Sequence, residues 1–253
     1  MLRVVKLGGN ELDRAGWLEA WAREVAQAGP VVIVHGGGRA ISALSGRLGL
    51  PIVQRDGLRV TSPEVAEVVE MVLAGPVSRV VVGALSRAGV DAVGVSGIDG
   101  GLLVAERYDQ NLGEVGRITS VHPALLTALL AAGFTPVVAP MAPAPDGSMM
   151  NVNADDAATA IATALPASEL LFVSDVPGVV LQGVAAAELP VAEVEPLIGR
   201  GVVTGGMAAK LRAAATALAG GVSRVRIGGR EMLTAPAAGT RLVATTVNAA
   251  LPA

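Results

Sequence analysis

Residues 2–9 read Leu2-Arg3-Val4-Val5-Lys6-Leu7-Gly8-Gly9, a short apolar run that ends in two glycines. Residues 31–38 repeat the pattern as Val31-Val32-Ile33-Val34-His35-Gly36-Gly37-Gly38. A β-branched apolar run that leads through a glycine turn into a helical pattern is typical of a buried strand in a parallel sheet. The two stretches therefore predict two βα units.

The same alternation continues along the chain, with short Val/Ile/Leu runs between longer Ala-rich segments of helical period. This order predicts an α/β fold built on a mainly parallel sheet. The predicted strands are Leu2–Leu7, Val31–Val34, Ala92–Val95, Pro136–Val138, Leu170–Val173 and Arg224–Ile227. The predicted helices are Arg14–Ala28, Gly38–Leu48, Pro63–Arg87, Pro123–Ala132, Asp155–Ala164 and Gly206–Leu218.

Some segments interrupt the alternation. Pro51–Val60 and Gly101–Arg117 are predicted hairpins, which we expect to lie as lids at one end of the sheet, and Pro140–Asp146 is a predicted loop. The helical segment Pro63–Arg87 keeps one apolar stripe but contains Gly75-Pro76. Because proline removes a backbone donor and clashes with the preceding turn, we expect this helix to be kinked or split.

Composition limits the class of protein. A chain of 253 residues, 52% hydrophobic but only 2% aromatic, can bury a large aliphatic core in one broad domain or two packed lobes. A net charge of -3 gives no electrostatic reason to expect a nucleic-acid partner, and arginine-containing stretches such as Ser223–Arg230 are interpreted as solvated edges. Gly, Pro or charged residues interrupt every apolar run before about 18 residues, and no secretory segment is recognised, which favours a soluble cytoplasmic protein.

The glycine turns after the first two strands are candidate anion sites. Glycines at the carboxyl end of a parallel strand let backbone N–H groups approach a ligand, and the following helix N-terminus favours negative charge. For either turn alone, ordinary tight-turn chemistry is an equal explanation. The sequence contains no G-x-x-x-x-G-K-[ST], G-x-G-x-x-G or G-x-S-x-G motif, and no cysteine. With only His35 and His122, it supports neither a histidine metal site nor a histidine relay.

Lysine is rare, since Lys6 and Lys210 are the only two among 19 basic residues. Both stand beside glycine turns, Lys6 before Gly8-Gly9 and Lys210 after Gly205-Gly206. A compact ammonium charge in such a place suits a phosphate. Chance survival of two lysines in an arginine-rich composition is the alternative.

Two further motifs carry polar groups. Asn151-Val152-Asn153-Ala154-Asp155 leads into a predicted helix, where one Asx residue is expected to act as the N-cap and the others are free to bind a ligand. Gly57-Leu58-Arg59-Val60-Thr61 places Arg59 on a hairpin, where its fork could grip a carboxylate.

Together, these motifs resemble the acetylglutamate kinases, a branch of the amino-acid kinase superfamily. The resemblance covers essentially the whole chain and rests on six stretches, Lys6–Gly9, His35–Gly38, Gly57–Thr61, Asn151–Asp155, Ser174–Gly178 and Thr204–Lys210, with a similar stretch at Leu112–Leu125. It implies a three-layer αβα sandwich, MgATP as the phosphate donor, and phosphorylation of N-acetyl-L-glutamate in arginine biosynthesis. It also implies an acceptor-binding and dimerising lobe at residues 1–166 and an ATP-binding lobe at 167–253.

The resemblance implies a role for each matched residue. Lys6 and Lys210 would stabilise the charge on the transferring phosphoryl group, and Asp155 would orient both lysines. Gly37, Gly38, Arg59 and Asn151 would bind the acceptor. The nucleotide would lie against Gly8, Gly9, Asp175, Val176, Pro177, Gly178, Val179, Val180, Val202, Val203 and Thr204. Mg²⁺ would be held mainly by the nucleotide phosphates, with no separate metal site on the protein.

The sequence departs from the family pattern at Ile98, where many relatives carry lysine, and at Gly75–Ser78. Because of Ile98, a second function remains an alternative, that of a related kinase that acts on aminoadipate attached to a carrier protein in lysine biosynthesis. A third alternative is a non-catalytic amino-acid or nucleotide sensor. We further expect a homodimer through Pro63–Arg87. Arginine is not expected to inhibit by ring assembly, because no segment before Leu2 supplies the interlocking N-terminal helix that the resemblance associates with that control.

Overall fold

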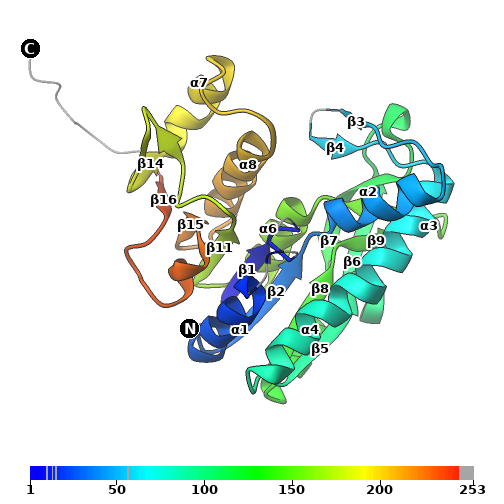
Figure 1. The fold of residues 1–253 in the computed structure, drawn as a ribbon, viewed down its shortest axis with the longest axis horizontal. Coiled ribbons are helices and arrows are strands. Elements are labelled where there is room, and N and C mark those ends of the chain that lie inside the picture. The colour runs from blue at the N-terminus through cyan, green and yellow to red at the C-terminus, as the bar shows by residue number, and fades with distance from the viewer. Residues whose placement is uncertain (10, 13, 15, 56, 245–253) are drawn as a thin grey trace, which may run out of the picture.

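The computed structural model describes residues 1–9, 11–12, 14, 16–55 and 57–244. Its centre is an eight-stranded sheet (Figure 1). In spatial order the strands are β14 (Glu188–Pro190), β16 (Thr240–Val243), β15 (Val225–Gly228), β11 (Glu169–Val173), β1 (Arg3–Leu7), β2 (Val31–His35), β8 (Thr135–Ala139) and β5 (Ala92–Ser96). Neighbouring strands are parallel except β15 and β16, which confirms the predicted mainly parallel sheet.

Alternation along the strands divides the core into two halves. Successive side chains of a strand point to opposite faces. Val4, Val32 and Phe172 therefore join one apolar cluster, while Val5, Ile33 and Leu171 join another. Because these strands are buried on both faces, their sequences are continuously apolar rather than alternating.

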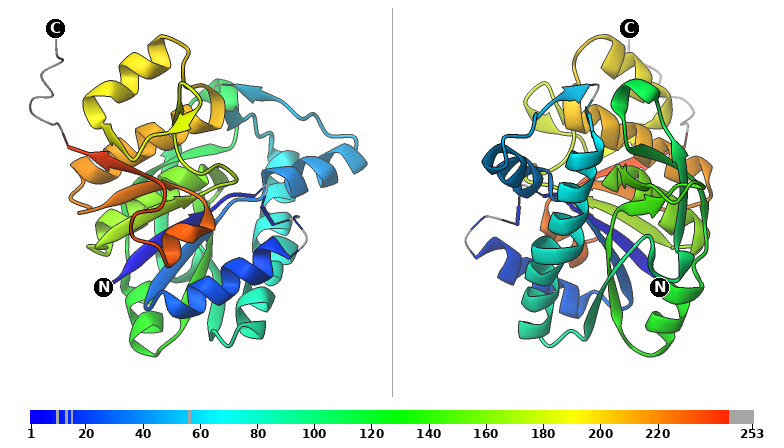
Figure 2. Two further views of the ribbon diagram at one scale, coloured as in Figure 1. Left: turned by 60° about the vertical axis from the view of Figure 1, so that its left-hand side comes forward. Right: turned by 90° about the vertical axis from the view of Figure 1, so that its right-hand side faces the viewer.

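Helices cover both faces of the sheet (Figure 2). The first cluster is completed by α5 (Ala124–Ala131), α6 (Ala154–Ala164) and α8 (Gly205–Ala219). The second is completed by α1 (Trp17–Gln27) and α4 (Ser78–Arg87). The protein is thus the expected αβα sandwich. Since β11 pairs with β1, the sheet runs continuously across the predicted lobe boundary at residue 166, and that division stays a prediction.

The remaining elements lie around this sandwich. They are α2 (Gly38–Arg47), α7 (Val194–Gly199), the hairpins β3–β4 (Gln54–Arg55, Leu58–Arg59) and β12–β13 (Val180–Leu181, Val184–Ala185), and 3₁₀ turns at Asp99–Gly101, Gln110–Leu112, Val191–Glu193 and Arg230–Leu233.

A second sheet has the order β6 (Leu103–Arg107), β7 (Val115–Val121), β10 (Met149–Val152) and β9 (Met141–Pro143). The predicted hairpin at Gly101–Arg117 is therefore half of a four-stranded sheet, and the loop prediction for Pro140–Asp146 is wrong where β9 forms.

The long helical segment is split as Gly75-Pro76 predicts. It consists of α3 (Pro63–Val72), the π-helical η1 (Leu73–Val77) and α4, and Gly75 has the non-helical angles φ -93° and ψ -112°. The apolar stripe faces the protein's own core, with Val65, Val69 and Val72 buried against α2 and Val81 and Leu85 against α1. By length and composition alone, Pro63–Arg87 could cross a membrane, but half of its most apolar window is buried, as in the core helix of a soluble protein.

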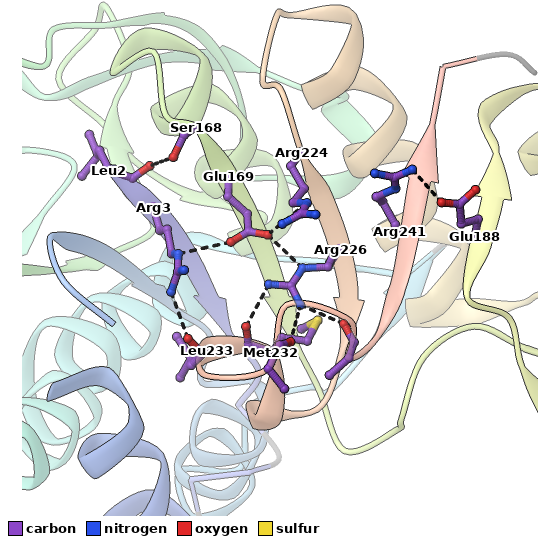
Figure 3. A network of polar contacts seen from close by, with 12 residues as sticks. Leu2, Arg3, Ser168, Glu169, Glu188, Arg224, Arg226, Met232, Leu233 and Arg241 are labelled. Atoms are coloured by element: carbon purple, nitrogen blue, oxygen red, sulfur yellow. Dashed lines mark hydrogen bonds and ion pairs between the residues drawn. The ribbon is translucent and has the colours of Figure 1, made fainter. Parts of the chain in front are cut away.

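A polar network centred on Glu169 ties together the amino ends of the central strands (Figure 3). Arg226 donates to Glu169 Oε1 at 2.8 Å and to the carbonyls of Met232, Ala235 and Ala238, and Arg3 lies 3.2 Å from the same carboxylate. Arg226 is only 2% exposed. The interpretation of Ser223–Arg230 as a solvated edge is therefore wrong for this side chain, because a fully paired guanidinium can be buried.

Candidate active site

Two glycine turns meet at the carboxyl ends of β1 and β2. Gly36 N donates to Leu7 O at 2.9 Å, which joins the turns directly. A methyl group added to Gly9 would lie 2.9 Å from the backbone nitrogen of Gly37, closer than a carbon atom tolerates. Only glycine lets the two backbones approach in this way. The predicted neighbouring anion sites are therefore in contact.

Two helices begin without a side-chain cap at this end of the sheet. The N-cap Gly37 of α2 has no side chain to offer, and the side chain of Thr204 accepts no hydrogen bond at the start of α8. By contrast, Ser62 caps α3, and Asn153 Oδ1 accepts from Asp155 N at 2.7 Å to cap α6. Uncapped first-turn N–H groups and the positive end of the helix dipole favour a bound anion.

Lys6, Asp155 and Lys210 come together from three elements. Asp155 Oδ1 lies 2.9 Å from Lys6 Nζ, and Oδ2 lies 3.8 Å from Lys210 Nζ. The three side chains are 8%, 8% and 14% exposed. Burial, and then the charge of Lys6, lowers the pKa of Lys210, while Asp155 opposes the shift. The site therefore holds two closely spaced cations with one carboxylate between them.

A cavity of about 160 Å³ opens between the β3–β4 hairpin, the second glycine turn and β10. Its lining includes Gly37, Gly38, Arg59 and Asn151, so four residues predicted to bind the acceptor face one space. Asn153 and Ala154 also line it, directly before Asp155 in the sequence. The cavity therefore reaches the start of α6, where Asp155 follows.

Arg59 is held by one half of its guanidinium. Its Nη2 donates to Gly38 O at 2.9 Å and to Ser42 Oγ at 2.8 Å. Its Nη1 is buried and has no hydrogen-bond partner within the described part of the chain, and burial lowers the pKa of the group. A buried donor without a partner is costly, so this nitrogen is suited to a carboxylate that enters the cavity.

Asn151 is connected to the same arginine. Its Nδ2 donates to Thr61 Oγ1 at 3.1 Å, and Thr61 Oγ1 in turn donates to Arg59 O at 2.9 Å. Thr61 is completely buried. This chain of hydrogen bonds fixes the orientation of the amide, which leaves Asn151 Oδ1 available to a donor such as an acylamide N–H.

The residues predicted to bind the nucleotide divide into two groups. Asp175, Val176 and Pro177 line a cleft of about 430 Å³ at the end of β11, and Val180 and Val202 are 45% and 52% exposed. The side chains of Val179 and Val203 are instead part of the core, so only their backbones could contact a ligand. Val179 N already donates to Thr240 Oγ1 at 2.8 Å.

Glu11 is a residue that the sequence reasoning missed. It lies on the loop after β1, is 2% exposed, and has a pKa raised mainly by burial. Lys6, Lys210 and Asp175 all act electrostatically on it, which places it in the same charged group. The available signal was an acidic residue two positions after the glycine turn at Gly8-Gly9.

The residues present fit a nucleoside triphosphate. Two uncapped helix N-termini and two buried lysines provide positive potential for phosphates. Among the residues that the structure describes, no group of three or more His, Cys, Asp or Glu side chains could hold a metal ion. A magnesium ion here would therefore need the phosphates themselves as ligands.

Comparison with known proteins agrees with this geometry. The sequence model of the amino acid kinase family matches residues 1–229. The chain belongs to the amino acid kinase family. It is 49% identical over 233 residues to the acetylglutamate kinase of Chloroflexus aurantiacus, covering 89% of this chain and 91% of the relative, and 45% identical over 229 residues to that of Rubrobacter xylanophilus, covering 90% and 89%. These relatives confirm the resemblance inferred from the motifs.

The solved structures agree on the fold. The crystal structure of smu.665 from Streptococcus mutans superposes with a TM-score of 0.85 at 30% identity, covering 96% of this chain and 99% of that one. The overall fold is therefore shared over almost the full length of that protein.

Proposed function

We propose that this kinase transfers the γ-phosphate of ATP to the side-chain carboxylate of N-acetyl-L-glutamate. The observation that supports this most directly is the acceptor cavity, which is lined by an arginine with a free buried nitrogen and reaches Asn153 and Ala154, directly before Asp155 of the Lys6–Asp155–Lys210 group. The acetylglutamate kinases that are 44–49% identical to most of the chain support the same acceptor.

The proposed phosphoryl transfer depends on the charges of the acceptor, the nucleotide and the site. A carboxylate oxygen of the acceptor attacks the γ-phosphorus, the bond from phosphorus to the β–γ bridging oxygen breaks, and ADP leaves with that electron pair. The acceptor is already ionised at pH 7, so no general base is needed. The obstacle is the approach of two anions, which positioning and positive charge overcome.

Each residue takes part through its place in the site. Arg59 and Asn151 hold the acceptor, and the N–H groups of Gly37 and Gly38 lie beside it. Lys6 and Lys210 stabilise the phosphoryl group in transfer, while Asp155 holds both lysines directed inward. Magnesium, bound mainly by the phosphates, would neutralise the triphosphate.

Two features of the wider protein belong to the same proposal. Residues 1–166 bind the acceptor and carry the dimer contact, and residues 167–253 bind ATP. Gly8 and Gly9 of the first lobe lie against the nucleotide together with Asp175 of the second. The enzyme acts in the cytoplasm as a homodimer. Shared biosynthetic chemistry with the acetylglutamate kinase relatives supports the location.

The two alternative functions are weaker. A kinase for carrier-bound aminoadipate is suggested only by Ile98, which is 38% exposed. A sensor that has lost transfer would have no need of two buried lysines around one carboxylate. The acetylglutamate kinase relatives favour neither reading.

A coupled assay of ADP release tests the proposal. The purified chain should release ADP with N-acetyl-L-glutamate and ATP, and acyl phosphate should be trapped by hydroxylamine. Free glutamate serves as the control, since it lacks the acylamide. Release of ADP only with the carrier-bound aminoadipate, or with neither acceptor, would overturn it.

A further inference from the structure

Glu11 has a buried oxygen without a partner. Its side chain is 2% exposed, yet Oε2 makes no hydrogen bond to any residue that the structure describes. Burying a carboxylate oxygen without compensation is expensive, and such groups are normally paired or bound to a metal. Among the described residues this oxygen is therefore free to take a partner that arrives from outside the chain.

The carboxylate lies inside the phosphate-binding turn. A methyl group added to Gly8 would lie 2.2 Å from Glu11 Oε2, so the carboxylate rests directly on this glycine. Gly8 N points to Val173 O at 3.3 Å, which connects the turn to the end of β11. Asp175 follows two residues later and is exposed to solvent. The two carboxylates thus follow the ends of two neighbouring strands, β1 and β11.

Carboxylates as well as lysines surround this place. Lys6 and Lys210 share the carboxylate of Asp155. Both lysines and Asp175 also act electrostatically on Glu11. Two lysines therefore stand among three carboxylates, those of Asp155, Glu11 and Asp175. A triphosphate adds several negative charges to that group. Like charges at short range in a partly buried site repel strongly. A divalent cation between the phosphates and the free carboxylates removes the conflict, and Mg²⁺ is typically held by one or two carboxylates together with substrate phosphates.

We propose that Glu11 is a direct protein ligand of the magnesium ion that accompanies ATP, with Asp175 as the second carboxylate. The inference rests on the proposed function only in taking ATP as the donor. It goes beyond an ion held by phosphates alone, and it gives the buried Oε2 its missing partner. Since the described residues form no metal cluster by themselves, the ion binds with the nucleotide and not before it.

Calorimetry with a non-hydrolysable ATP analogue, with and without Mg²⁺, tests the assignment. Metal binding and nucleotide binding are reciprocally coupled, so a lost ligand reduces the factor by which Mg²⁺ strengthens nucleotide binding. In Glu11→Gln this factor should fall about tenfold or more. Metal-free nucleotide binding should be unchanged or tighter, because an anion has been removed. The electron paramagnetic resonance spectrum of Mn²⁺ in the nucleotide complex should also change.

Glu19→Gln is the matched control. Glu19 lies on α1 near the same loop, but its side chain is 49% exposed and faces Arg87. This variant should keep the wild-type metal enhancement. If Glu11 serves only to balance the lysines, Glu11→Gln will change nucleotide affinity by the same factor with and without metal, and the proposal is wrong.

Asp175→Asn provides a second measurement, because its exposed side chain tolerates the change even if Glu11→Gln folds poorly. Both single variants should reduce the metal enhancement, and the double variant should lose less than the product of the two effects, as expected for ligands of one ion. Unchanged enhancement in Asp175→Asn, or fully independent effects, overturns the shared site. No acceptor is present in these titrations, so failure of acetylglutamate as a substrate would leave the result interpretable.

Discussion

Asp155 Oδ1 lies 2.9 Å from Lys6 Nζ, with both side chains almost completely buried. The other oxygen of the same carboxylate lies 3.8 Å from Lys210 Nζ, a longer and looser contact. Lys6 comes from β1 and Lys210 from α8, so the start of α6 connects the two ends of the chain. Lys210 can therefore move toward a phosphate without breaking a close ion pair, whereas Lys6 is held in place.

Lys210→Ala should reduce turnover far more than it weakens acetylglutamate binding. In the proposed mechanism this lysine faces the place where charge develops on the transferring group, and loss of one such donor typically costs roughly 10²–10³-fold in kcat. Steady-state kinetics measure the effect. Arg212→Ala, on the same helix but exposed and paired with Glu195, is the control and should retain activity. An unchanged kcat with a raised KM would mean that Lys210 only binds substrate.

Much of the fold could be predicted because its strands are buried on both faces. Continuous apolar runs such as Val31–Val34 and the glycine turns after them specify parallel strands without tertiary information. The observed β2 and α2 begin at the predicted residues, Val31 and Gly38. The elements that were missed are short or depend on long-range pairing. Met141–Pro143 forms β9 only because β10 lies antiparallel to it, and no local pattern contains that information.

The residues of the candidate site could be proposed from the sequence because their motifs follow one another in the order found in the acetylglutamate kinases. Asn151 and Arg59 were identified, but their link through Thr61 depends on side-chain geometry between residues far apart in the sequence. Glu11 was missed because a lone glutamate in a loop normally indicates solvent exposure. Its burial arises from the close approach of the glycine turns, which a sequence pattern does not reveal.

Arg59→Lys should weaken acetylglutamate binding markedly and leave ATP binding almost unchanged. The native guanidinium uses Nη2 to hold Gly38 O and Ser42 Oγ and keeps Nη1 free, and a single ammonium group cannot serve both sides. Calorimetry with each ligand separates the effects. Arg55→Lys, exposed on the same hairpin, is the control. Equal weakening of both ligands would indicate that Arg59 orders the site as a whole.

His35 should make the protein less stable as the pH falls. Burial lowers its pKa from 6.5 to about 4, and Nδ1 donates to Gly36 O while the buried Nε2 has no partner among the described residues. The unfolded chain binds the proton at higher pH, so stability present above pH 6.5 is lost as the pH approaches 4. The full difference is roughly 3 kcal/mol.

Urea unfolding of wild type and His35→Gln between pH 7 and 4 isolates this effect. The variant should lack the histidine-dependent part of the slope. The effect of Asp156 on stability falls in the same pH range and has the opposite sign. Loss of solvation, and then the charge of Asp155, raises its pKa to about 6, although its side chain still reaches solvent. That contribution is common to both proteins and cancels in the difference. Parallel stability curves would show that His35 is not held neutral by burial.

The last prediction concerns assembly through Pro63–Arg87. Most of its apolar stripe packs into the protein's own core, which leaves Met71, 54% exposed, and Val80, 48% exposed, on the outward side. Large apolar groups exposed on one element are suited to a two-fold partner that presents the same surface. Wild type should therefore scatter light as a dimer across a range of concentrations, and Met71→Glu with Val80→Glu should shift it to monomer, because two charges on each side would be buried against one another. Val184→Glu, the same change at a 71% exposed position on the β12–β13 hairpin, should leave the dimer intact. A monomeric wild type, or a double variant with the wild-type mass, would place the interface elsewhere or remove it.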